Sequence, residues 1–281
     1  MNIKEQIEKL EKINELKKNK NYKMSSLKEL QSLPKYNGVL NLKFNSNNFF
    51  MLNIENDDAV PLKYLWRDGY EKLSLDLWYK ITREDGYFLD IGAHTGIYSI
   101  IGNLNTKKNN IISIEPYFLN YSRLLTNLKL NNISTINTFF VSASNDEGID
   151  KFLVKTRSNY HSSGGRISKD GNLNVVKNKI DNFKFNKKLV AMKIDTEGHE
   201  FEVLEGAQNY INQYRPKIIF EINEKSFDKC LDLIKKFNYK FFYLNEKEGK
   251  IFKIEKFDKY LLSSEGANCY ATTENILQDK I

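Results

Sequence analysis

The order of apolar and polar positions divides the chain into a short N-terminal part and a longer part in which strands and helices alternate. Near the N-terminus, isoleucine and leucine recur at helical spacing from Ile3 to Leu16, with Glu and Lys between them, which predicts an amphipathic helix. Another short helix is predicted within 24–33. Alternating residues then predict two strands, at 40–44 and 49–54, joined by a four-residue turn.

From residue 64 onward, short apolar runs alternate with stretches of helical periodicity. This alternation is typical of α/β proteins, in which helices connect parallel strands. The predicted helices are 64–81, 97–104, 119–130, 196–210 and 227–237. The predicted strands are 87–89, 111–114, 138–141, 189–194, 218–220, 239–244, 251–254 and 269–272. We therefore expect an N-terminal helical and β-hairpin extension at 1–55 and a main α/β domain at 56–281.

The first candidate chemistry lies between Gly86 and Tyr98, where an apolar strand is followed by a glycine-containing turn and a helix. Asp90 closes the strand. Gly92 lacks a Cβ and would let a ligand approach the backbone, whereas Gly96 would let the first helical turn pack against the strand. The free amides of such a helix start bind polar or anionic groups. The alternative is an ordinary turn between a strand and a helix.

Glu115 adds to this signal because it ends the next predicted strand, which Pro116 terminates. An acidic residue at that point can accept hydrogen bonds from both ribose hydroxyls of a nucleoside cofactor. The turn lacks the Gly-x-Gly-x-x-Gly pattern that cradles a pyrophosphate, and it holds Ala93 and His94 instead. The residues therefore favour a nucleoside cofactor without phosphates over a dinucleotide.

Three blocks carry a family resemblance: Asp90–Tyr98, Glu115–Pro116 and Lys193–Glu200. Together they resemble the FkbM-type methyltransferases, which use S-adenosylmethionine, and the resemblance covers roughly residues 50–275. It implies a doubly wound, mostly parallel, seven-stranded sheet of the Rossmann-like class I methyltransferase type. It also implies that Tyr70 and Glu71 approach the mouth of the cofactor site. The implied cofactor-binding residues are Asp90, Gly92, Ala93, His94, Gly96, Tyr98, Glu115, Pro116, Ser142, Ala143 and Asp195.

Methyl transfer to a hydroxyl group needs a base, and the end of the fourth predicted strand offers several candidates. Asp195 closes this strand, Glu197 and His199 follow it, and Glu221 ends the next strand. The pKa of a histidine suits proton removal near neutrality. The alternative is a histidine that only packs, because helix N-termini disfavour the charged imidazolium. The candidate catalytic residues are therefore Asp195, Glu197, His199 and Glu221.

Oxygen ligands also gather at these strand ends. Asp195, Glu221 and Asn223 resemble the site of metal-dependent catechol-type methyltransferases, and Mg²⁺ accepts such ligands. Because oxygen groups are common in polar pockets, we expect no metal, with Mg²⁺ at these three residues as the alternative.

The segment 156–172 is rich in serine and glycine and too polar for a core. Long segments without regular structure in compact domains often cover a substrate. We expect a substrate loop in which Tyr160, His161 and Arg166 contact the acceptor. The alternative is a mobile connection without a binding role.

Composition narrows the function classes. The net charge of +7 over 281 residues permits nucleic-acid binding, but lysine recurs throughout and no block of five basic residues marks a dedicated patch. Cys230 and Cys269 lack metal-ligand spacing, and we expect them to be reduced. No apolar signal core opens the chain and no run approaches membrane-spanning length, so we expect a cytoplasmic protein without a membrane span.

The sequence as a whole therefore predicts an S-adenosylmethionine-dependent O-methyltransferase. The resemblance implies a hydroxyl acceptor on a sugar, a surface glycan or a small metabolite. The alternatives are a nucleic-acid methyltransferase, a nicotinamide oxidoreductase, which the missing glycine pattern disfavours, and a cofactor-binding module without turnover. The N-terminal helix either packs on its own domain or joins two subunits of a homo-oligomer.

Overall fold

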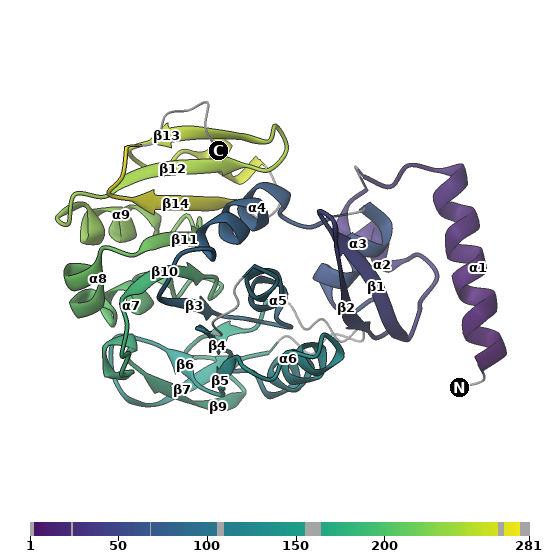
Figure 1. The fold of residues 1–281 in the computed structure, drawn as a ribbon, viewed down its shortest axis with the longest axis horizontal. Coiled ribbons are helices and arrows are strands. Elements are labelled where there is room, and N and C mark those ends of the chain that lie inside the picture. The colour runs from purple at the N-terminus through teal and green to yellow at the C-terminus, as the bar shows by residue number, and fades with distance from the viewer. Residues whose placement is uncertain are drawn as a thin grey trace.

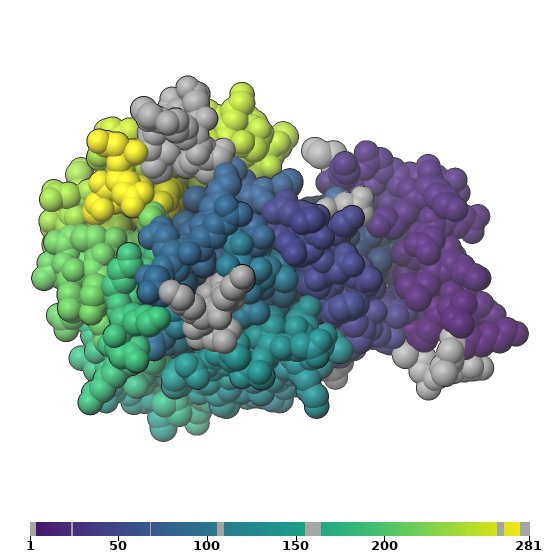
Figure 2. Space-filling model, in the orientation of Figure 1, coloured from purple at the N-terminus to yellow at the C-terminus, as the bar shows by residue number. Residues whose placement is uncertain are grey.

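The protein is seen here as a computed structural model, which combines an α/β body with a smaller N-terminal part at one end (Figure 1; Figure 2). The residues that it describes are 3–23, 25–67, 69–105, 110–154, 164–263 and 267–275.

The body is built on one mixed sheet that has eight strands among the described residues. In spatial order the strands are β13 (Lys250–Ile254), β12 (Lys240–Asn245), β14 (Asn268–Thr272), β11 (Lys217–Glu221), β10 (Leu189–Ile194), β3 (Tyr87–Ile91), β4 (Ile111–Ile114) and β5 (Asn137–Phe139). The neighbours from β11 to β5 pair in parallel, and β14, β12 and β13 continue the sheet by antiparallel pairing. The doubly wound, mostly parallel fold is confirmed. The seven strands that the resemblance implies are one too few, because β13, predicted at 251–254, also joins the sheet beside β12.

Helices cover both faces of this sheet, as the continuous apolar strands require: every residue of β4 and β10 is buried. Figure 1 shows α4, α5 and α6 on one side and α7, α8 and α9 on the other, and a buried apolar cluster fills each side. No helix in the described part of the chain is long and apolar enough to cross a membrane. The helices are α1 (Ile3–Asn19), α2 (Leu27–Gln31), α3 (Ala59–Arg67), α4 (Lys72–Ile81), α5 (Ile97–Asn103), α6 (Phe118–Leu130), α7 (Glu200–Glu205), α8 (Gln208–Tyr214) and α9 (Phe227–Lys235), with 3₁₀ turns at Ile180–Asn182 and Lys259–Ser263.

The order of the parallel strands creates a switch point in the main sheet. From β3 the chain moves outward through β4 to β5, and it later returns to the other side of β3 through β10 and β11. The connections therefore leave β3 and β10 in opposite directions. Open α/β sheets bind ligands at such a switch point, beyond the carboxyl ends of the strands.

The N-terminal part consists of α1, α2, α3 and a hairpin of β1 (Gly38–Phe44) and β2 (Asn47–Asn53). The expected hairpin is present, but only two residues separate the strands, because Phe44 pairs with Asn47. The amphipathic helix α1 buries Ile13 within this chain, while Ile7 is 51% exposed. The N-terminal helix therefore packs on its own chain through part of its apolar face.

Two predicted helices are interrupted where the backbone turns left-handed. The helix expected at 64–81 is divided into α3 and α4, and Glu71 before α4 has a φ of 37°. The helix expected from Thr196 begins only at Glu200, because Glu197 and Gly198 have positive φ. It is divided again before α8. The left-handed residues form turns at the carboxyl edge of the sheet, where the sequence pattern suggested regular helix.

The segment after β5 forms a second sheet, which has four strands among the described residues. Its strands are, in spatial order, β6 (Ser142–Ala143), β9 (Leu173–Asn178), β7 (Gly148–Leu153) and β8 (Arg166–Ile167). The prediction that Ser142 and Ala143 end the third strand of the main sheet is wrong, because they pair with β9. The segment 156–172 is not entirely irregular either, since β8 lies within it. Tyr160 and His161 lie outside the described residues.

Candidate functional site

A cavity of about 250 Å³ lies beyond the carboxyl ends of β3, β4 and β10, at the switch point of the main sheet. Of the sequence-predicted site residues, Gly96, Arg166 and Asn223 do not line its wall. The cavity brings together most of the others: Asp90, Gly92, Ala93, His94, Tyr98, Glu115, Pro116, Ser142, Ala143, Asp195, Glu197, His199 and Glu221.

Glu115 forms a buried acceptor on the β3–β4 side of the cavity. Its carboxylate accepts hydrogen bonds from the backbone amides of His94 at 2.9 Å and Tyr117 at 2.8 Å, and the residue is 4% exposed. Burial raises the pKa of Glu115, while the nearby His94 and these amides act in the opposite direction. A carboxylate has about four acceptor positions, so Glu115 keeps capacity for ligand hydroxyls.

The two glycines of the turn after β3, Gly92 and Gly96, each allow another segment of the chain to pack closely against the backbone. A Cβ on Gly92 would lie 1.8 Å from the carbonyl oxygen of Asp195, and its φ is +73°. Gly92 therefore lets the end of β3 pass against the end of β10. A Cβ on Gly96 would lie 2.5 Å from Leu124 Cδ1. The prediction that Gly96 packs against the strand is wrong, because its neighbour is α6.

His94 occupies the turn between these glycines in a left-handed conformation, with a φ of 51°. Its Nδ1 lies 3.8 Å from Asp58 Oδ1, whereas its Nε2 is buried without a hydrogen-bond partner among the described residues. Unpartnered buried nitrogens are rare in native proteins, so this ring nitrogen fits a site that receives a polar ligand. Two other non-glycine residues of the cavity wall, Glu71 and Glu197, also have left-handed backbones, with φ of 37° and 56°. Such strain gathers at functional sites.

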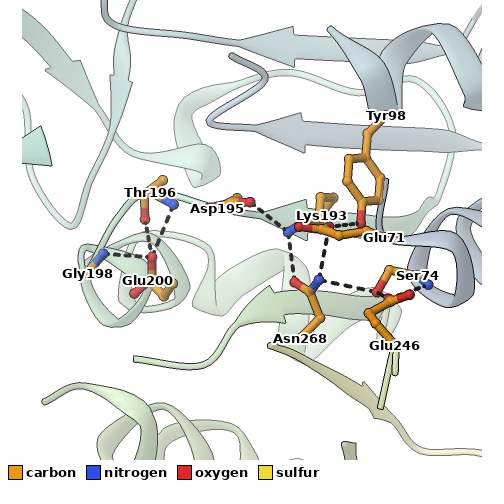
Figure 3. Close-up of polar contacts among 10 residues, drawn as sticks. All are labelled: Glu71, Ser74, Tyr98, Lys193, Asp195, Thr196, Gly198, Glu200, Glu246 and Asn268. Atoms are coloured by element: carbon orange, nitrogen blue, oxygen red, sulfur yellow. Dashed lines mark hydrogen bonds and ion pairs between the residues drawn. The ribbon is translucent and has the colours of Figure 1, made fainter. Parts of the chain in front are cut away.

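The opposite side of the cavity holds a buried lysine among acidic and amide groups, as Figure 3 shows. Lys193 is 1% exposed, and its Nζ lies 3.1 Å from Asp195 Oδ2 and 3.0 Å from Asn268 Oδ1. Glu71 accepts hydrogen bonds from the Tyr98 hydroxyl at 2.7 Å and from Asn268 Nδ2 at 3.1 Å. Sequence reasoning missed Lys193 and Asn268. A charged residue inside the apolar strand 189–194 was the signal that could have identified Lys193.

Glu197 and Glu221 are two of the carboxyl groups near Asp195 whose pKa values are raised. Glu197 is open to solvent at the cavity, but partial loss of hydration and the charge of Asp195 raise its pKa to about 7. Burial and the neighbouring acids Asp195 and Glu197 raise the pKa of Glu221 well above its usual value, although Lys193 opposes this. Perturbed carboxyls in a cavity are candidates for proton transfer near neutral pH.

Glu200 has a structural role in the same turn. Its Oε1 accepts hydrogen bonds from the backbone amides of Thr196 at 3.1 Å and Gly198 at 3.0 Å, and from the Thr196 hydroxyl at 3.1 Å (Figure 3). The side chain is fully buried. Glu200 therefore fixes the turn that carries Glu197 between β10 and α7.

His199 lines the cavity, but both of its ring nitrogens face groups of this chain. Nε2 lies 3.0 Å from Ser144 Oγ, and Nδ1 lies 3.5 Å from Glu202 Oε2. Burial lowers the pKa of His199, with Glu202 acting in the opposite direction. The ring therefore joins α7 to the segment after β6.

The residues suggested as metal ligands are only partly assembled. Asn223 Oδ1 accepts a hydrogen bond from the backbone amide of Lys225 at 3.0 Å, within the turn after β11. Among the described residues there is no group of three or more histidine, cysteine, aspartate and glutamate side chains arranged to hold a metal ion.

Comparison with known proteins gives a family match. A sequence model described as the methyltransferase FkbM domain matches residues 90–241, more than half of the chain. No curated protein sequence matches. Among solved structures, the chain is similar to a methyltransferase FkbM from Methylobacillus flagellatus KT, with 16% identity, a TM-score of 0.41 and coverage of 75% of this chain and 52% of that chain. It spans about half the length of that protein.

Two further solved structures are similar at lower identity. One is a precorrin-6y C5,15-methyltransferase from Geobacter metallireducens GS-15, with 13% identity, a TM-score of 0.43 and coverage of 70% of this chain and 87% of that chain. The other is an S-adenosylmethionine-dependent methyltransferase from Agrobacterium tumefaciens, with 8% identity, a TM-score of 0.44 and coverage of 84% and 70%.

Proposed function

The chain belongs to the FkbM methyltransferase family, and from this we propose that it transfers a methyl group from S-adenosylmethionine to a hydroxyl on a sugar, a surface glycan or a small metabolite. One observation carries the proposal. A single cavity has the buried acceptor Glu115 on one side and the acidic cluster around Asp195 on the other. A cofactor and an acceptor can therefore meet within one cavity.

The β3–β4 side of the cavity fits a nucleoside cofactor. Glu115 would accept hydrogen bonds from the ribose hydroxyls, and Ser142 and Ala143 would flank the adenine. The unpartnered Nε2 of His94 supports a polar ligand here. When bound, S-adenosylmethionine supplies an electrophilic methyl group. Asp195 stands on the wall where the two sides meet, and it would face the charged end of the cofactor.

The β10–β11 side supplies the groups that a hydroxyl acceptor needs. Asp195, held by Lys193, would accept a hydrogen bond from the hydroxyl and orient it. Glu197 would take the proton, because its pKa of about 7 balances basicity against ionisation near neutrality. Glu221 is the second candidate for this role. His199 is less suited, because Ser144 and Glu202 already face its nitrogens.

The same carboxylates disfavour a nucleic-acid acceptor. Asp195, Glu197 and Glu221 all line the cavity, and the negative charge of Asp195 and of ionised Glu197 would repel a phosphodiester backbone. The net charge of +7 belongs to lysines along the whole chain. We therefore place the nucleic-acid methyltransferase second. A binding module without turnover is the third reading, and it shares the cofactor half of this proposal.

We also propose how the chain is divided into domains. Residues 1–55 form an N-terminal extension, and residues 56–281 form the methyltransferase domain. A cytoplasmic location is supported by Cys230 and Cys269, which are buried free thiols and typical of a reducing compartment. We propose that magnesium has no role. Chelator treatment that abolishes turnover, with recovery on adding magnesium, would overturn this last point.

The function is tested by incubating the protein with methyl-labelled S-adenosylmethionine and a panel of sugars, sugar nucleotides, phenols and RNA. We expect label in a hydroxyl-bearing small molecule or glycan, located on oxygen by mass spectrometry. Glu115→Gln is the matched negative control, because it weakens the cofactor site. Label in RNA alone would support the second reading. Calorimetric binding of S-adenosylhomocysteine without any product would support the binding module, and no binding would overturn all three.

A further inference from the structure

Lys193 is a buried cation on the cavity wall, and the reaction proposed above uses it only to hold Asp195. It is the polar residue of an otherwise apolar strand, β10, and its side chain is buried. The ammonium contacts Asp195 and Asn268 and lies 5.0 Å from the centre of the Tyr98 ring. A buried charge is costly unless paired and hydrogen-bonded, so a lysine in this place needs all of these partners.

The partners of Lys193 come from separate elements, as Figure 3 shows. Asp195 directly follows β10, Asn268 begins β14, and Tyr98 lies in α5. Asn268 also donates hydrogen bonds to Glu71 at 3.1 Å and to Ser74 Oγ at 3.2 Å. The lysine therefore joins the end of β10 to the start of α4 through one amide side chain.

The start of α4 is fixed from the far edge of the sheet. Glu246, after β12, accepts hydrogen bonds from the backbone amides of Leu73 at 2.7 Å and Ser74 at 2.9 Å, and from the Ser74 hydroxyl at 2.6 Å. This distant carboxylate caps a helix whose own preceding residue, Glu71, makes no capping bond. The cap holds Glu71 on the cavity wall.

The charges around Lys193 keep its amine protonated, as this arrangement requires. Burial favours the neutral amine, but the carboxylates of Asp195, Glu71 and Glu221 outweigh it and raise the pKa of Lys193. Lys193 is therefore a fixed ammonium between acidic groups on two walls of the cavity.

We propose that Lys193 is a positioning residue for the acceptor: its ammonium holds the Asp195 carboxylate at the β10 end and, through Asn268, the Glu71 carboxylate at the start of α4. An acceptor hydroxyl then meets two pre-oriented carboxylates. The inference rests on the proposed function, because it assigns a role in the acceptor half of that site. The other reading is an ion pair that only stabilises the fold.

The kinetic test compares Lys193→Met, Lys193→Arg and Lys217→Met. Lys217 is the matched control, because it lies in the neighbouring strand and pairs with Glu84 and Glu274 away from the cavity. In Lys193→Met we expect kcat for the acceptor found in the screen to fall about 10²-fold, as small misplacements can cause, with S-adenosylhomocysteine affinity by calorimetry nearly unchanged. Lys193→Arg should recover much of the loss, and Lys217→Met should keep full turnover.

A second measurement does not depend on turnover. The lysine ammonium signals are recorded by NMR on the wild-type protein, and the Lys193 signal is assigned by its loss in Lys193→Arg. Because the ammonium is buried and bonded, its hydrogens should exchange slowly, and Asp195→Asn or Asn268→Ala should accelerate the exchange. Asn268→Ala also serves if Lys193→Met fails to fold, and its kcat should fall with cofactor affinity kept.

The outcomes separate this inference from the proposed function. If wild type methylates no hydroxyl acceptor, the proposed function fails, and the positioning role in acceptor turnover fails with it even if the ammonium is protected. If wild type is active but Lys193→Met and Asn268→Ala keep full kcat, or Asp195→Asn leaves the exchange unchanged, Lys193 is a structural ion and the inference is overturned.

Discussion

The two sides of the cavity are built in different ways. On the β3–β4 side, the hydrogen bonds span short stretches of chain: Glu115 accepts from the amides of Tyr117, two residues later, and of His94, 21 residues earlier. On the β10–β11 side, side chains are held by residues far along the chain, as in the bond from Leu73 to Glu246. The β3–β4 side presents the carboxylate of Glu115, held by backbone amides. The β10–β11 side presents several charged side chains, such as Lys193 and Asp195, that contact one another.

This difference shows where each half of the proposed reaction is vulnerable. A nucleoside needs shape and a few fixed hydrogen bonds, which a local turn can supply. Proton transfer needs carboxyl groups whose pKa values are shifted, and on this side burial and neighbouring acids together raise the pKa values of Glu197 and Glu221. Gly92 belongs to both sides, because it lets the end of β3 touch the end of β10.

The largest effect should come from Gly92→Ala, which disrupts the contact between the end of β3 and the end of β10. The new Cβ would collide with the Asp195 carbonyl, and alanine disfavours the φ of +73°. We expect a loss of about 3 kcal/mol or more in the free energy of unfolding, together with loss of S-adenosylhomocysteine binding. Denaturant unfolding and calorimetry measure the two effects.

Gly249→Ala is the control, because Gly249 has a similar φ of +63° and a Cβ placed there would meet no atom of the described residues within 4 Å. It should cost only about 1 kcal/mol, the backbone part alone. Equal losses in the two variants would contradict the proposed contact between the strand ends.

The next largest effect concerns proton transfer. It should impair turnover on the β10–β11 side and leave the cofactor side unchanged. If Glu197 takes the hydroxyl proton, its carboxylate form is the active one, and kcat should rise as pH increases through about 7. Glu197→Gln should lower kcat by about 10²–10⁴ and remove this acidic limb, while cofactor affinity is kept. Rates measured against pH test this.

Glu224→Gln is the matched control for this side, because Glu224 is exposed in the turn after β11 and does not line the cavity. It should keep the wild-type profile. A Glu197→Gln variant with an unchanged acidic limb would transfer the role to Glu221, whose pKa is also raised.

A smaller effect is expected on the β3–β4 side, where a change at Glu115 should weaken cofactor binding. Glu115→Gln removes the charge and leaves one oxygen, although the amides of His94 and Tyr117 bond different oxygens of Glu115. S-adenosylmethionine should therefore bind more weakly by about 1.5–3 kcal/mol. The KM for the acceptor should change little. Calorimetry on a folded variant with unchanged affinity would contradict the role of Glu115.

The sequence predicted the β3–β4 side well, because its polar residues follow two successive strands, β3 and β4. The pattern of Asp90, Gly92 and Glu115 identified the strand ends, and all three line the cavity. It failed where the backbone turns left-handed and where distant segments meet. The helix predicted from Thr196 begins late because Glu197 and Gly198 turn left-handed, and no periodicity encodes that turn.

The β10–β11 side shows the same limit. Lys193 was part of a recognised block, but its partner Asn268 follows 75 residues later, and strand pairing alone brings them together. Ser142 and Ala143 lie on the cavity wall as expected, although they belong to a different sheet. Local pattern therefore located the cavity, and long-range packing set its charges.

The smallest effect on turnover should come from His199→Ala. Both ring nitrogens already face Ser144 and Glu202, so the variant should keep nearly full kcat and the same pH profile. Its cost should appear in stability, at about 1–3 kcal/mol, because the buried Ser144 hydroxyl then keeps only its longer hydrogen bond, to Asn145 Oδ1 at 3.4 Å. A drop of about 10²–10⁴ in kcat with loss of the acidic limb would instead make His199 the base.

The pH dependence of stability gives His199 a second, independent check. Its pKa is lowered in the folded protein, so below about 6.5 the unfolded chain binds the proton first and wild type loses stability as pH falls. His199→Ala lacks this loss, and the stability difference between the two proteins should therefore shrink on acidification. Adding Ser144→Ala should restore part of the stability, because removing both partners of a buried hydrogen bond is nearly neutral. A difference that stays constant with pH would mean that the ring is not held neutral by burial.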